Sequence, residues 1–159
     1  MGIGKEIKHN NFRSEHHKLL VNIVYSSNWL LEKIKQFLEC EDITHQQYNI
    51  LRILNRHSQP MSTLQIREQM LDKMSDTSRI VERLLKKGLV HKIVRLQDKR
   101  LVDVTITPKG IEVVNRIDEK ATVMDNITSG LSEQDAQKLN LLLDQMRENN
   151  MVPQLNVSS

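Results

Sequence analysis

The sequence contains few of the residue types on which several classes of protein depend. Its single cysteine, Cys40, cannot form an intramolecular disulfide, which fits a reducing compartment. Aromatic residues make up only 3% of the chain, too few to expect a surface on which single-stranded bases stack. Five glycines in 159 residues form no phosphate-cradling loop, and no nucleophile–base pair or metal triad is visible. We therefore expect no enzymatic activity and no bound cofactor or metal.

Long apolar segments are also missing. No run approaches the roughly 18 apolar residues of a membrane-spanning helix, and the N-terminus lacks the apolar segment of a signal peptide. Residues 1–10 are polar and are expected to be frayed. Because 38% of the residues are hydrophobic and 27% are charged, we expect a soluble globular protein with one core or two small lobes. The missing apolar segments lead us to expect it in the cytoplasm.

Positive charge is concentrated in the middle of the chain. Lys/Arg and Asp/Glu number 9 and 8 in residues 1–72, 10 and 4 in residues 73–109, and 4 and 8 in residues 110–159. The three segments therefore have net charges of +1, +6 and −4. A basic middle suggests one face that binds a polyanion. A solvated helix face and a charged turn would produce the same sums, so charge alone does not distinguish a polyanion-binding face from an ordinary solvated surface.

Helical periodicity and helix-start signals predict six helices. Apolar residues recur at helical spacing from Phe12 to Leu38. In a capping box, the N-cap hydroxyl and the side chain three residues on satisfy each other's backbone N–H groups. Such boxes predict helix starts at Thr44–Gln47, Ser62–Gln65 and Ser132–Asp135. Two more helices are expected, one from about Ser75 to the C-cap Gly88 and one from Thr107 and Pro108 through Ile127.

Two short apolar runs predict strands, at Leu89–Val94 and Leu101–Ile106, joined by a charged turn. The expected order is α-α-α-α-β-β-α-α, a mainly α fold with a small β-wing. Residues 62–88 have the spacing of a helix-turn-helix, and the hairpin that follows directly would be its wing.

The second helix of this pair has two different faces. When the sequence is projected on a helix that turns about 100° per residue, the apolar residues fall on one side and the basic residues on the other. Short polar side chains at its start would let the helix enter a DNA groove, where arginine reaches guanine edges or phosphates. The expected DNA-binding residues of this recognition helix are Ser75, Asp76, Thr77, Ser78, Arg79, Arg83 and Lys86. Ser62 and Thr63, which open the preceding helix, are expected on the DNA backbone. An amphipathic surface helix without a ligand would look similar.

The charged turn between the strands supplies a second group of candidates, Arg95, Asp98, Lys99 and Arg100. A wing tip can lie along the minor groove, where the negative potential favours arginine. Asp98 cannot itself bind phosphate. We expect it to hold Arg100 in one rotamer through a charge-assisted pair.

These segments resemble the MarR family of bacterial transcription regulators. Asp98-Lys99-Arg100 followed by Val104-Thr105-Ile106-Thr107-Pro108-Lys109-Gly110 is similar to the family's wing motif, with Ile106 where leucine is usual. Residues 78–92 (SRIVERLLKKGLVHK) resemble its recognition helix and first wing strand. The resemblance implies a winged helix-turn-helix homodimer and matches Arg79 and Arg100 to the family's DNA-contacting or wing-fixing arginines. Lys73 is a departure, because some members carry there an acid that braces the wing.

The resemblance also implies that different segments of the chain bind DNA and form the dimer. We expect one MarR-like domain over residues 1–159, with a DNA-binding lobe at 44–107 and a helical dimerisation region at 11–40 and 108–149. The helices of that region carry more apolar surface than a small winged domain can cover, and an isologous two-fold interface would bury it. Ile117 and Leu142 are expected in this seam.

Sensing functions find little support in the sequence. His9, His16, His17, His45, His57 and His91 show no recognisable zinc arrangement, and only His16 and His17 beside Glu15 form a cluster. Cys40 lies among acidic residues at a helix end, which disfavours a thiolate. Some relatives bind small aromatic acids between their two lobes. Tyr25, Trp29 and Met124 could line such a pocket here, although a core position fits each of them.

We therefore expect a homodimeric regulator that binds double-stranded DNA sequence-specifically, most simply a repressor on a palindromic operator. One alternative is a winged-helix module that binds protein instead of DNA. Another is a metal- or redox-responsive sensor whose output is DNA binding. The sequence names no small-molecule effector.

Overall fold

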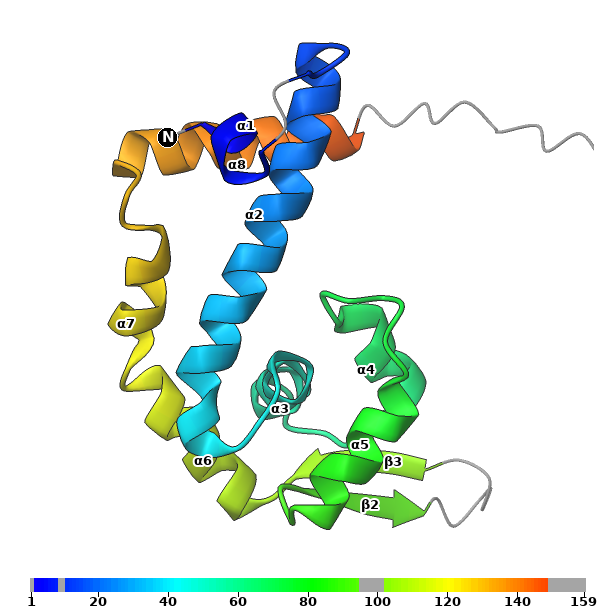
Figure 1. The fold of residues 1–159 in the computed structure, drawn as a ribbon. Helices are drawn as coiled ribbons and strands as arrows, with labels where there is room; N and C mark the ends of the chain where they lie inside the picture. Colours follow the sequence, from blue (N-terminus) through cyan, green and yellow to red (C-terminus); the bar gives the residue numbers. More distant parts are fainter. Residues whose placement is uncertain (1, 9–10, 95–101, 149–159) are drawn as a thin grey trace, which may run out of the picture. The chain divides into compact units, whose positions relative to one another are not determined.

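The computed structural model describes residues 2–8, 11–94 and 102–148 of the chain (Figure 1). It is mainly helical, with one antiparallel sheet in the order β1-β3-β2. The helices are α1 (Ile3–Glu6), α2 (Glu15–Leu38), α3 (His45–Arg56), α4 (Thr63–Gln69), α5 (Thr77–Lys86), α6 (Pro108–Asp118), α7 (Ala121–Asp125) and α8 (Glu133–Glu148). The strands are β1 (Met61–Ser62), β2 (Val90–Val94) and β3 (Val102–Ile106), and the short 3-10 turns are η1 (Glu39–Glu41) and η2 (Asn126–Thr128).

The predicted helix starts are confirmed at α3 and α4. In the first capping box the Thr44 hydroxyl accepts the Gln47 N–H at 3.2 Å, and the Gln47 side chain accepts the Thr44 N–H at 3.0 Å. The third start differs in one bond. The Ser132 hydroxyl accepts the Asp135 N–H at 3.1 Å, but it also donates to the Asp135 carboxylate at 2.6 Å. An aspartate is one methylene shorter than the glutamate of a capping box, which favours this local bond.

The wing is a three-stranded sheet rather than a two-stranded ribbon. The predicted hairpin pairs Val90 with Ile106 and Val94 with Val102. The additional strand β1 pairs Met61 with Val104 and Ser62 with Asp103. It was not predicted because two residues are too few to display an alternating pattern.

Two expectations about the helices are wrong. Residues 1–10 were expected to be frayed, but Ile3–Glu6 form the short helix α1. The helix expected from Pro108 through Ile127 is divided into α6, α7 and η2. At the first division the Lys120 N–H bonds to the Ile117 carbonyl three residues back, at 3.0 Å. No proline or glycine lies there, so no local signal in the sequence marked it.

The junction between the wing and α6 depends on two glycines and a threonine. Gly88 ends α5 with a φ of +70°, which glycine adopts without strain. The Thr107 hydroxyl donates to the Gly88 carbonyl at 2.9 Å and accepts the Gly110 N–H at 3.0 Å. A Cβ on Gly110 would lie 2.3 Å from the Leu89 carbonyl oxygen, so only glycine fits there. These contacts place the start of α6 beside the end of α5.

The buried core joins α3, α4 and α5 to both wing strands, the end of α2 and one face of α6. Its most deeply buried members include Leu38, Ile50, Leu51, Ile66, Met70, Val81, Leu84, Val90, Val104 and Val114. Ile117 is also in this core, with 3% of its surface exposed. The expectation that it lies in a dimer seam is therefore wrong, because the inner face of α6 completes the winged lobe.

The chain divides into two compact units between Met124 and Asp125. The first holds α1 to α6, the sheet and most of α7, and the second holds η2 and α8. Over the described ranges, no helix combines the length and apolarity needed to cross a membrane.

Candidate nucleic-acid interface

Helices α4 and α5 form the predicted helix-turn-helix, and α5 lies against β2 (Figure 1). Val81 and Leu84 on the inner face of α5 have no exposed surface, while Ile80 and Leu85 are half-buried beside them. Across the turn they share one core with Ile66 of α4. The predicted apolar face is thus confirmed. Since it is fully used in packing, the opposite face of α5 is turned to solvent.

The exposed face of α5 is basic. Ser78, Arg79, Arg83 and Lys86 are all exposed along it. Within the part of the chain that the structure describes, the three cationic side chains form no ion pair. Asp76 is the N-cap, and its carboxylate accepts the Arg79 N–H at 3.1 Å. The helix therefore presents uncompensated positive charge, and its only acid at the N-terminus serves as the cap.

Two of the candidate DNA-binding residues, Ser75 and Thr77, are not exposed on this face. The Thr77 side chain is in the core, 5% exposed, with its hydroxyl donating to the Met70 sulfur at 3.4 Å. Ser75 is half-buried, and its hydroxyl donates to the Asp72 carboxylate at 2.5 Å. Both side chains stabilise the fold around the turn.

Asp72 organises the turn between the two helices, a role not predicted for it. One of its carboxylate oxygens accepts the Ser75 hydroxyl and the other accepts the Met74 N–H at 3.0 Å. The Ser75 hydroxyl, followed by the Met74 N–H, lowers the pKa of the Asp72 carboxyl below its ordinary value. An aspartate three residues before a serine, between two helices, is the sequence signal for such a turn.

The start of α4 and the wing strand are tied to this unit as well. The Ser62 hydroxyl accepts the Gln65 N–H at 3.2 Å, and the half-buried Thr63 follows it. On the other side, Lys92 of β2 forms an ion pair with Glu82 of α5. This pair connects the wing to the margin of the basic face of α5.

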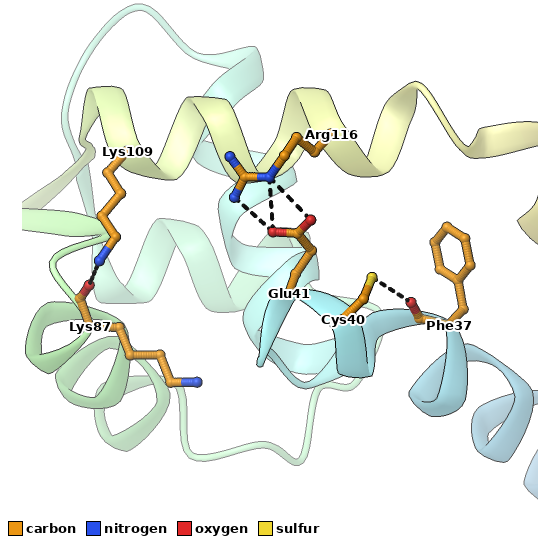
Figure 2. A network of polar contacts seen from close by, with 6 residues as sticks. All are labelled: Phe37, Cys40, Glu41, Lys87, Lys109 and Arg116. Carbon is orange, nitrogen blue, oxygen red and sulfur yellow. Dashed lines mark hydrogen bonds and ion pairs between the residues drawn. The ribbon is translucent and has the colours of Figure 1, made fainter.

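Polar contacts tie η1 and the residue after it to α6 and to the end of α5. Figure 2 shows the Glu41–Arg116 and Lys87–Lys109 contacts. Arg116 donates to both carboxylate oxygens of Glu41, at 2.7 and 3.1 Å. The Arg116 guanidinium, mainly through these hydrogen bonds, lowers the pKa of the Glu41 carboxyl. Lys109 donates to the Lys87 carbonyl at 3.0 Å, and Lys87 in turn pairs with Asp42 at 2.9 Å. Partners this far apart in the sequence carried no local signal.

Comparisons with known proteins agree with this geometry. The model of the MarR family matches residues 43–102, which contain the helix-turn-helix and the hairpin. A curated relative, the HTH-type transcriptional repressor IacR of Pseudomonas putida, is 27% identical over 114 residues, covering 71% of this chain and 68% of IacR.

Residues 43–102 are thus a MarR-type segment.

Solved MarR structures share the fold over most of the chain. A MarR-like transcription regulator from Bacillus cereus has a TM-score of 0.76 and 22% identity, and covers 86% of this chain and 99% of its own. The S. aureus MepR–DNA complex has a TM-score of 0.70 and 25% identity, and covers 87% and 98%. The winged-helix fold prediction is confirmed. The family and the fold are those of transcription regulators, not of enzymes.

The four wing-tip candidates lie outside the described residues. They are Arg95, Asp98, Lys99 and Arg100. Lys73 is the residue that departs from the family pattern. Its ammonium group donates a hydrogen bond to the Glu68 carbonyl near the end of α4. The proposed brace between Asp98 and Arg100 therefore stays a prediction.

A cavity of about 780 Å³ lies between α2, the start of α3 and the end of α5. Leu31 and Lys35 line it from α2, and Arg83 and Lys86 line it from α5. Tyr25, Trp29 and Met124, the three residues suggested for an effector pocket, do not line this cavity. Tyr25 and Trp29 are exposed, and Met124 is half-buried against the core.

The candidate sensor residues are dispersed. Over the described ranges, no group of three His, Cys, Asp or Glu side chains is placed to hold a metal ion. His17 accepts the Arg13 N–H at 3.3 Å, which makes it part of a helix start. Cys40 is exposed, and its thiol donates to the Phe37 carbonyl at 3.4 Å (Figure 2).

Proposed function

We propose that this protein is a sequence-specific double-stranded-DNA-binding repressor that acts on a palindromic operator as a homodimer. The observation that carries the proposal is the basic outer face of α5, where Arg79, Arg83 and Lys86 have no acidic partner among the described residues. Unpaired cations on a helix seated in a helix-turn-helix suit the phosphates and base edges of the major groove.

Two relatives support this reading. MepR of S. aureus has been solved in complex with DNA, and IacR is named as a transcriptional repressor. We place Ser78, Arg79 and Arg83 at base edges and their flanking phosphates, and Lys86 on the backbone. Ser62 and Thr63 would face the backbone from α4. At the wing, Arg95, Lys99 and Arg100 would follow the minor groove, with Asp98 fixing Arg100.

The homodimer is supported by apolar surface that the chain leaves uncovered. On α2, Leu20, Val24 and Leu31 are 62%, 55% and 39% exposed. They fall within about 40° of one another around the helix. On α8, Leu139, Leu142 and Met146 are spaced three and four residues apart and are also exposed. Stripes of this kind fit an isologous interface, which would set two α5 helices about 34–36 Å apart, one turn of DNA.

Salt dependence of binding to duplex DNA tests the proposal. A dimer that neutralises ~6–10 phosphates should give a log–log slope of roughly −5 to −9. Because each variant removes two contacts from a dimer, Lys86→Ala should make the slope shallower by about 2. Lys33→Ala, which removes an exposed lysine of α2, is the matched control and should leave the slope unchanged. A slope near zero for the unmodified protein would instead favour a module that binds protein.

A further inference from the structure

Three large apolar side chains are exposed on α4 and on the turn between α4 and α5. Leu64 is 64% exposed, Leu71 is 89% exposed and Met74 is 91% exposed. Single exposed apolar residues are common on protein surfaces, but a group beside a basic face needs an explanation. The core of the lobe is already filled by their neighbours Ile66 and Met70, so packing does not account for it.

The turn holds Leu71 and Met74 on an ordered backbone. The Met74 N–H is bonded to the Asp72 carboxylate at 3.0 Å, and the Leu71 N–H is bonded to the Asn49 side chain at 3.0 Å. Fixing the backbone on both sides of Lys73 reduces the conformational entropy that Met74 would lose on contacting a ligand.

Leu64 and Met74, but not Leu71, line one hollow. It has a volume of about 370 Å³ and is also lined by Arg67, Asp76 and Ser78. It therefore lies where α4 meets the N-terminus of α5, next to Arg79. Leu64 and Met74 are the apolar side chains of a mostly polar lining, which holds one cation, Arg67, and one carboxylate, Asp76. Such a hollow can hold a small apolar group of a ligand that is otherwise polar.

We propose that Leu64 and Met74 read thymine by contacting its C5-methyl group in the major groove. This inference rests on the proposed function, since it assigns specificity to the same DNA-binding face. The thymine methyl is the one apolar group that a base pair presents in that groove, and apolar side chains recognise it. Methionine suits the task because its unbranched thioether adapts to the methyl position. Arg67 and Arg79 would neutralise the phosphates on either side.

Uracil substitution tests this contact, because it removes the methyl group and nothing else. A duplex would first be selected from a random library with the full-length protein. Each thymine would then be replaced in turn by uracil and binding measured. We expect one position per half-site at which uracil weakens binding about three- to fourfold, as the loss of one buried methyl implies. With Met74→Ala, thymine and uracil should bind equally at that position.

Leu71→Ala is the matched control, since it removes an equally exposed side chain of the same turn that does not line the hollow. It should retain the full thymine-to-uracil ratio. An unchanged ratio in Met74→Ala, or no uracil-sensitive position in the unmodified protein, would overturn the inference while leaving DNA binding intact. If Met74→Ala instead alters only the sedimentation coefficient, the patch contacts protein and the inference is wrong. Failure to enrich any duplex would count against the proposed function itself.

Discussion

Helices α2 and α3 follow each other in the chain and carry similar apolar periodicity, yet they end in different surroundings. The apolar residues of α3, including Ile50, Leu51 and Leu54, are buried in the winged lobe. The middle of α2 leaves Leu20 and Val24 exposed, and only its end, at Leu38, enters the core. The apolar surface of α3 is thus covered within the winged lobe, whereas the apolar stripe of α2 is left for a second molecule to cover. Changes to α3 should therefore affect folding, and changes to α2 should affect assembly.

The largest expected effect would test this division at α2. Val24→Glu would place a carboxylate in each half of a two-fold seam. At about 2–3 kcal/mol for each buried polar group, the dimer should weaken by roughly 5 kcal/mol. Sedimentation at several concentrations should show monomers, while circular dichroism shows a folded lobe.

Asn22→Glu is the control for that experiment, because it adds the same charge about 160° around the helix from Val24. It should remain dimeric. If both variants dimerise normally, the exposed stripe of α2 is not the seam.

The second prediction concerns stability. Leu51→Ala empties part of a fully buried site and should lower the free energy of unfolding by about 2–5 kcal/mol. Leu20→Ala removes the same atoms from a site that only the proposed dimer would bury, so at concentrations where the protein is monomeric it should cost less than about 0.5 kcal/mol. Urea denaturation measures both. Equal losses at the two sites would contradict the comparison.

A third prediction extends the comparison to the two faces of α5. Arg79→Ala leaves the buried face intact, so stability should be unchanged. Binding to a selected duplex should weaken by about 1–3 kcal/mol, with much less effect on random DNA. Arg100→Ala should weaken both, and Asp98→Ala should resemble a milder Arg100→Ala. A double-mutant cycle of Asp98→Ala and Arg100→Ala checks the brace, because the effects of two paired residues on binding should not add. If Asp98→Ala instead tightens DNA binding and its effect adds to that of Arg100→Ala, Asp98 only repels the phosphates.

A smaller effect is expected where η1 contacts α6. The Glu41 side chain is 10% exposed and that of Arg116 is 48% exposed, and breaking their pair with Glu41→Gln should cost about 1 kcal/mol at pH 7. The folded-state pKa of Glu41 lies below its ordinary 4.5, so the pair stabilises the protein above that value. The advantage over Glu41→Gln should shrink as the pH falls through the lowered pKa. A pH-independent gap between the two proteins would show that the charge of Glu41 is irrelevant.

The smallest effect is expected at Cys40. Its thiol is exposed and makes one weak bond, so Cys40→Ser should change stability by less than about 0.5 kcal/mol. Peroxide should leave DNA binding of the unmodified protein unchanged, as measured by gel shift. Loss of binding on oxidation that Cys40→Ser prevents would make this residue a sensor.

Much of the winged lobe could be predicted because its signals are local. Hydroxyl and amide side chains three residues apart predicted the starts of α3 and α4, and Gly88 predicted the end of α5. The apolar and basic sides of α5 followed from helical periodicity alone. The two-residue strand β1 and the division of α6 from α7 carried no comparable pattern, since both depend on contacts with distant residues.

The sequence by itself determined where most helices begin, which faces are apolar and that the outer face of α5 is basic, because caps and periodicity act over three or four residues. Only the tertiary structure decided what covers each face. It put Ile117 and Thr77 in the core, joined Glu41 to Arg116, and left Met74 exposed in a turn organised by Asp72. The physical reason is that burial and long-range pairing depend on which segments meet in space, and periodicity describes only one segment at a time.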